Sequence, residues 1–156
     1  MGDTITAGEI AEAQKIWGEG IVTIGKSFTE KGDYRKAAEN HLDTLYAFEN
    51  GTVLFKPTKA ADSQFRLTRE SALSYFVGGN DKYKEDHGFA IHPWTNVRFE
   101  NTANYIHGDY AVAMGNYFFT QLDGSEVKVE YTFGYFKNQD GKLKINLHHS
   151  SVPFSS

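Results

Sequence analysis

The chain has 156 residues, no cysteine, and 16 basic against 20 acidic side chains, which give a formal charge of −4. This length fits a single domain, residues 1–156, and the absence of cysteine excludes disulfides, iron–sulfur clusters, thiolate zinc sites and cysteine nucleophiles. The weakly negative charge, with no basic cluster, argues against nucleic acid and an anionic membrane as partners. Aromatic residues make up 15% of the chain, which favours a pocket or an interface lined with rings.

The first third of the chain is predicted to be helical. Thr6-Ala7-Gly8-Glu9 has the spacing of a capping box. Behind it, apolar residues recur every three or four positions as far as Phe28, and Gly32 ends the helix. Asp33 is suited to cap a second helix, which Asn50-Gly51 stops.

A short strand is predicted at residues 52–55, before Pro57. A third helix is predicted from a Thr68 cap to Gly78-Gly79, and it carries Tyr75. Tyr75 either lines a pocket or belongs to the core. Pro57 fixes the geometry that presents Thr58, or Thr58 lies in an ordinary exit from an edge strand.

From Phe89 onward the hydrophobic period is two, which predicts strands around residues 94–101, 110–121, 126–137 and 142–152. They are separated by hairpin dipeptides at 108–109, 123–124 and 140–141. Strand 110–121 is apolar on both faces, so both faces must be covered. The first helices can cover one face, and a second subunit could cover the other. The order predicts an α+β fold, N-terminal helices packed on a strongly curved antiparallel sheet. This arrangement is similar to the cone of nuclear transport factor 2.

The last strand carries the most chemistry. Leu143, Ile145 and Leu147 share one face, and extending that alternation places His149 and Ser151 inward, with His148 and Ser150 outside. Buried polar groups without partners cost about 1–3 kcal/mol each, so this pair must be engaged inside the cone. A purely structural explanation is that the two side chains bond to each other and to a nearby Tyr or backbone group.

A metal site is not expected. Neighbouring residues of a strand point to opposite faces, so His148 and His149 cannot hold one ion unless the strand bulges. The other histidines, His41, His87, His92 and His107, show no recognised ligand spacing. We therefore expect no metal and no cofactor. The unusual run His92-Pro93-Trp94 either rims the mouth of a pocket or starts a bulged strand.

The closing run His148-His149-Ser150-Ser151-Val152-Pro153 resembles the terminal motif of the iota-class carbonic anhydrases. Residues 55–58, 88–94 and 131–136 also resemble segments of that family, and the similarity extends from Glu39 to Phe154.

The resemblance implies reversible hydration of carbon dioxide to bicarbonate in a cone-fold homodimer that associates through the outer sheet face. Some members of the family are described as metal-free, and others have been assigned manganese or zinc. Its functional Thr, Tyr, His and second Ser fall here on Thr58, Tyr75, His149 and Ser151 as catalytic residues. Thr58, Tyr75 and Ser151 would also bind the substrate, and His149 would act as base or proton relay.

Two other functions stay open on sequence grounds. One is an isomerase or lyase of the ketosteroid-isomerase kind, for which no inward Asp or Glu base is evident. The other is a non-catalytic ligand-binding or association domain.

The N-terminus lacks a secretory signal, and no apolar run approaches the ~20 residues of a membrane span. We therefore expect a soluble, cytoplasmic protein. Met1-Gly2 fits the loose myristoylation pattern, although one such chain anchors only weakly.

Overall fold

The computed structural model describes residues 4–155, so Gly2 and its predicted modification pattern lie outside the described residues. Helix α1 (Ala7–Thr29) starts at the expected capping box, in which Thr6 accepts from the Glu9 backbone N–H and Glu9 accepts from that of Thr6. Helix α2 (Tyr34–Leu45) is capped by Asp33. Helix α3 (Arg69–Val77) runs from the Thr68 cap to Gly78. All three predicted helices are confirmed.

Helix α2 ends earlier than the sequence pattern predicts. Tyr46 leaves the helix in an extended conformation and forms a parallel bridge with Ile145, and a single 3-10 turn, η1 (Phe48–Asn50), follows. This early exit swings the Tyr46 side chain into the interior, where it is 1% exposed.

The sheet contains β1 (Leu54–Lys56), β2 (Asn96–His107), β3 (Tyr110–Thr120), β4 (Glu126–Lys137) and β5 (Leu143–Ser151). Its spatial order is β1-β5-β4-β3-β2. Strands β2 to β5 form the predicted antiparallel meander, but β1 runs parallel to β5. The sheet is therefore mixed rather than wholly antiparallel, because no hairpin links these two distant strands and sets their direction.

The hairpin turns are those predicted from the dipeptides. Gly124 and Gly141 have φ values of +89° and +78°, a region that favours glycine. A second 3-10 turn, η2 (Phe89–Ile91), leads into β2.

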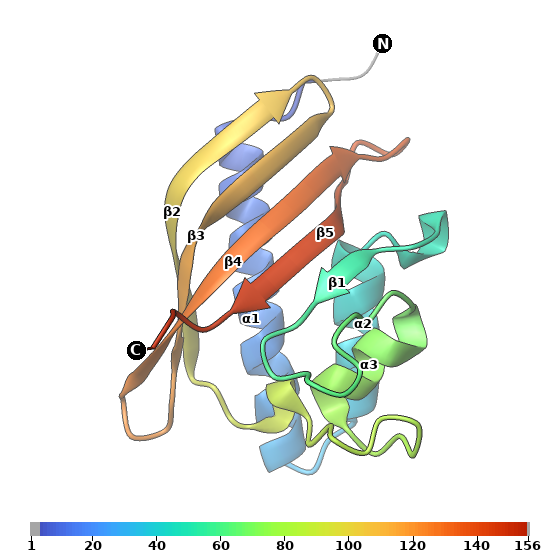
Figure 1. The fold of residues 1–156 in the computed structure, drawn as a ribbon, viewed down its shortest axis with the longest axis vertical. Coiled ribbons are helices and arrows are strands. Elements are labelled where there is room, and N and C mark those ends of the chain that lie inside the picture. Colours follow the sequence, from blue (N-terminus) through green and yellow to red (C-terminus); the bar gives the residue numbers. More distant parts are fainter. Residues whose placement is uncertain (1–3, 156) are drawn as a thin grey trace.

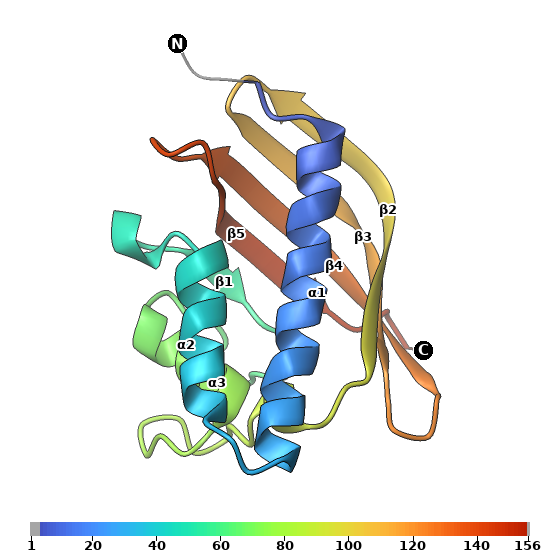
Figure 2. The same ribbon diagram turned by 180° about the vertical axis from the view of Figure 1, so that it is seen from behind.

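The helices pack on one face of the sheet (Figures 1 and 2). Helix α1 crosses that face diagonally, and α2 and α3 lie beside it near β1. The inward side chains of β4 are those predicted by alternation, with Tyr131, Phe133 and Tyr135 at most 2% exposed. Phe133 meets Trp17 of α1, with ring centroids 5.8 Å apart, and Trp17 is 1% exposed. Burial of each such side chain contributes about 1.5–3 kcal/mol to folding, so this contact layer fixes α1 on the sheet.

The opposite sheet face carries no helix among the described residues (Figure 1). Met114 on β3 points outward from it and is 52% exposed. The prediction that β3 is apolar on both faces therefore holds, and its outer side is open in the single chain.

Candidate active site

The two inward polar residues of β5 are His148 and Ser150, with exposed fractions of 2% and 1%. His149 is exposed on the outer face, and Ser151 donates its hydroxyl to Glu130 Oε1 at 3.0 Å on the same side. The predicted inward facing of His149 and Ser151 is therefore wrong by one residue.

The physical reason is a bulge in β5. Gly134 of β4 pairs with Leu147, whereas the next residue, Tyr135, pairs with Ile145, so Asn146 is an extra residue in the ladder. A bulge breaks the alternation, and both Ile145 and His148 consequently point inward. Gly134 makes room for this feature, since a Cβ there would lie 2.9 Å from both Asn146 Oδ1 and Leu147 Cβ.

His148 and Ser150 border a small cavity between the sheet, α1, α3 and the segment after β1. Its volume open to the centre of a water molecule is about 10 Å³, which is close to the space that one water requires. Aromatic rings form most of the wall, and hydroxyl groups supply most of the rest. The lining residues are Trp17, Phe55, Pro57, Thr58, Tyr75, Phe76, Phe89, Tyr117, His148 and Ser150.

The imidazole of His148 is held on all sides. Phe55 stacks on it with ring centroids 4.7 Å apart, and Phe133 lies 4.3 Å away. Its Nδ1 is 2.8 Å from the Tyr46 hydroxyl, and its Nε2 is 3.1 Å from the Tyr117 hydroxyl. Burial lowers the pKa of His148 well below its ordinary value, and the charges of nearby His41 and His149 act in the same direction. His148 is therefore neutral at pH 7.

These contacts favour one direction for a hydrogen-bond chain, the one in which every buried donor has an acceptor. The indole N–H of Trp17 can only donate, and it donates to the Tyr46 oxygen at 2.9 Å. Tyr46 then donates its own proton to Nδ1 of His148. A neutral imidazole with Nδ1 as acceptor carries its proton on Nε2, so His148 donates to the Tyr117 oxygen.

The chain continues from Tyr117 into the cavity. The Tyr117 hydroxyl lies 2.5 Å from Ser150 Oγ, and Ser150 Oγ lies 2.6 Å from Thr58 Oγ1. Because Tyr117 accepts from His148, it donates to Ser150, which in turn donates to Thr58. The hydroxyl proton of Thr58 is thus the last in the series and is directed away from Ser150.

Tyr75 completes this end of the cavity. Its oxygen accepts the backbone N–H of Lys59 at 3.1 Å, so its own proton remains available for donation. Burial raises the pKa of Tyr75, whereas the hydrogen bonds from Lys59 and from the Thr58 hydroxyl lower it. The hydroxyls of Thr58 and Tyr75 therefore lie together at the cavity wall, with the Tyr75 proton free to donate, and no charged group lines the cavity.

A buried ion pair holds in place the loop that carries Thr58 and Lys59. Arg66 is fully buried and binds both carboxylate oxygens of Asp86, at 2.7 and 2.8 Å. The Asp86 carboxylate also accepts from Ser74 of α3 at 2.5 Å. Beside it, Glu85 accepts backbone N–H groups of Ser63, Ala61 and Asp62, which lower its pKa to about 2. These contacts tie residues 57–66 to α3 and hold Thr58 opposite Tyr75.

The chain is similar to a defined family along most of its length. A family model described as metal-independent carbonic anhydrase matches residues 8–152. The chain belongs to this family.

Two relatives of the metal-independent carbonic anhydrase family match closely. A metal-independent carbonic anhydrase of Nostoc sp. strain PCC 7120 is 42% identical over 153 residues, 96% of this chain and 75% of the relative. The crystal structure of an iota-carbonic anhydrase from a cyanobacterium, complexed with bicarbonate, is 40% identical with a TM-score of 0.96 and covers 100% of this chain and 97% of that one.

A more distant match shows only the shared fold. An NTF2-like protein of unknown function from Pseudomonas putida KT2440 has a TM-score of 0.57 at 16% identity, covering 97% of this chain and 91% of the other. The expected cone-type α+β fold and the resemblance to iota-class carbonic anhydrases are thus confirmed.

The family resemblance assigned Thr58 and Tyr75 to the site, and both residues line the inner cavity. Sequence reasoning missed Tyr46, Tyr117 and the inward-facing pair on β5. Tyr117 stands in the sequence as one more apolar ring of β3. Only the burial of a hydroxyl in need of a partner distinguishes it, and that is visible only in three dimensions.

The remaining histidines do not meet at one point. His92 and His87 border an outer groove, as expected for a pocket rim at His92-Pro93-Trp94, and His41 is buried beside Trp17. Within residues 4–155, no group of three or more His, Asp or Glu side chains is arranged to hold a metal ion. None of the helices in this range is both long and apolar enough to span a bilayer.

Proposed function

We propose that this carbonic anhydrase interconverts carbon dioxide and bicarbonate in the cavity between Thr58, Tyr75 and Ser150, without a metal. The observation that carries the proposal is the one-way hydrogen-bond chain from Trp17, which ends in O–H donors at the cavity wall. The bicarbonate complex of the cyanobacterial relative supports the choice of ligand.

The reaction must avoid free hydroxide. Forming hydroxide from bulk water at pH 7 without a metal costs about 12 kcal/mol, more than a few hydroxyl groups can supply. The water oxygen therefore bonds to the carbon while one O–H bond of the water breaks and one C=O π bond opens, and the released proton passes to a base of the buffer. Negative charge develops on the former carbon dioxide oxygens, and the Tyr75 hydroxyl, positioned beside Thr58, donates to them. Each such preorganised donor is worth up to about 3–4 kcal/mol.

His148 acts as a positioning residue. Both of its nitrogens are engaged and burial lowers its pKa, so it is a poor base at neutral pH. Its contribution is to keep Tyr117, Ser150 and Thr58 donating toward the reactants. The exposed position of His149 removes the geometric basis for its expected role as base, and the outer position of Ser151 does the same for its role as a substrate ligand.

Stopped-flow hydration of carbon dioxide by chelator-treated protein tests the proposal. Wild type should stay active, and Thr58→Val, which keeps the side-chain shape, should lower kcat/KM by about 10²-fold. Thr52→Val is the matched control, because Thr52 is exposed just before β1. Absence of hydration in wild type, or equal rates in Thr58→Val and the control, would overturn the assignment. Loss of activity on chelation with recovery on adding one metal would overturn the metal-free chemistry.

We also propose a homodimer formed through the outer sheet face. Support comes from Met114, which is 52% exposed in the middle of β3, and from a groove of about 350 Å³ beside it. His149 and Ser151 border this groove, so the outward half of the terminal motif would lie at the interface. Sedimentation equilibrium should give a dimer for wild type and a monomer for Met114→Glu. A wild-type monomer at all concentrations would contradict this association.

A further inference from the structure

A second, larger cavity adjoins the one described above. It is a surface groove of about 390 Å³, and it shares Tyr75 and Phe89 with the inner cavity. These two rings stack with centroids 5.6 Å apart and an interplanar angle of 16°. The stacked pair therefore forms the partition between the inner cavity and the groove.

Hydration of carbon dioxide releases a proton that must reach solvent. The inner chain offers no exit, since Trp17 can only donate and the neutral His148 already has both nitrogens in use. Moving a proton back along this chain would require reversing every O–H bond and charging a buried imidazole. The exit therefore lies on the side of Tyr75, which faces the groove.

The groove is lined by acidic, basic, phenolic and imidazole side chains, which differ in their ability to carry a proton. Its titratable side chains are Lys59, Tyr75, Glu85, Asp86, His87 and His92. The two carboxylates are already engaged with Arg66 and with backbone or hydroxyl donors. An ammonium such as that of Lys59 has no acceptor site, and burial raises the pKa of Tyr75. The imidazoles remain as the groups that can both accept and donate a proton through their two ring nitrogens.

We propose that His92, assisted by His87, transfers the proton between the inner cavity and the buffer; this inference rests on the proposed function. In hydration, the proton released as water bonds to carbon dioxide passes by way of the groove to an imidazole nitrogen and then to a buffer base. In dehydration, the imidazolium returns it as the C–O bond of bicarbonate breaks and water forms.

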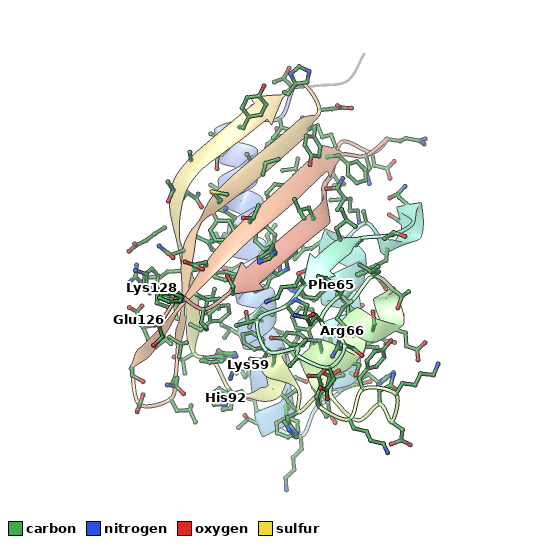
Figure 3. All side chains as sticks on the ribbon, in the orientation of Figure 1. Lys59, Phe65, Arg66, His92, Glu126 and Lys128 are labelled. Carbon is green, nitrogen blue, oxygen red and sulfur yellow. The ribbon has the colours of Figure 1, made fainter. Side chains whose placement is uncertain are left out.

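The setting of His92 suits this task. Its ring lies against Trp94 with centroids 4.4 Å apart, and its Nε2 is 3.3 Å from Gln121 Oε1. The ring is therefore oriented while its side chain stays exposed to solvent. Figure 3 shows His92 below Lys59, which lies on the loop that follows β1, and both residues line the groove.

The test measures kcat and kcat/KM for carbon dioxide hydration over a range of buffer concentrations. His92→Ala and the double variant with His87→Ala should lose about tenfold or more in kcat at low buffer, with kcat/KM unchanged. Added imidazole should restore kcat. His107→Ala is the matched control, because His107 is an exposed imidazole at the end of β2 that does not line the groove.

The outcomes separate this inference from the proposed function. If wild type hydrates carbon dioxide and Thr58→Val does not, but kcat of the double variant equals wild type at every buffer concentration, proton transfer by the groove histidines is refuted. A loss of kcat that imidazole does not restore would indicate a structural role and would also refute it. Failure of wild type to hydrate carbon dioxide would instead reject the proposed function.

Discussion

Ser150→Ala and Ser151→Ala form a pair of substitutions that separates the two faces of β5. Ser150 Oγ bridges the Tyr117 and Thr58 hydroxyls at 2.5 and 2.6 Å, whereas Ser151 bonds only to the exposed side chain of Glu130. Removing Ser150 Oγ leaves the Tyr117 proton without its acceptor and Thr58 without the donor that orients it. Loss of the orientation of these hydroxyl donors costs about 3 kcal/mol of transition-state stabilisation, which lowers kcat by about 10²-fold.

The assay is stopped-flow hydration at a fixed, high buffer concentration, with urea denaturation as a second measurement. Ser150→Ala should lose about 10²-fold in kcat and about 1–3 kcal/mol of unfolding free energy, because a buried hydroxyl is left unpaired. Ser151→Ala should change kcat by less than about twofold and the unfolding free energy by less than about 0.5 kcal/mol. The reverse result, with Ser151→Ala inactive and Ser150→Ala active, would refute the facing of β5 and the chain built on it.

Three further predictions concern the surroundings of the site. Arg66→Met leaves Asp86 buried without its cation and should lower the unfolding free energy by about 3–5 kcal/mol in urea denaturation, whereas the exposed Arg69→Met should cost less than about 1 kcal/mol. Burial holds the pKa of His41 at about 3 and that of His148 well below 6.5, so the unfolded chain binds more protons below pH 6.5. The free energy of unfolding should therefore fall by roughly 2 kcal/mol as the pH drops from 6 to 5, and His41→Leu should reduce that fall by about half. Tyr46→Phe removes the donor to Nδ1 of His148 and should lower kcat by about tenfold or more in the hydration assay; an unchanged kcat would contradict the assigned direction of the chain.

Much of the fold follows from local signals in the sequence. The capping box at Thr6 and Glu9, the Thr68 cap and the hairpin dipeptides each act over two to four residues, so they can be identified without knowledge of tertiary contacts. The parallel pairing of β1 with β5 joins residues more than ninety positions apart, and no local signal encodes it.

The residue types of the site could be predicted from the sequence, but not which side chains of β5 point inward. A period of two along β5 gave the wrong pair because Asn146 is an extra residue in the ladder. The cause lies on the neighbouring strand, where Gly134 leaves space for the bulge. The doubled His-His-Ser-Ser motif adds to the ambiguity, since either facing puts one imidazole and one hydroxyl inside.

The size of the inner cavity has a kinetic consequence. A space of about 10 Å³ holds one water, yet hydration joins two molecules there. The stacked rings of Tyr75 and Phe89 are the part of that wall that also borders the larger outer groove. We infer that the second reactant reaches the cavity past this aromatic pair, so the packing of these two rings bears on how fast the protein can work.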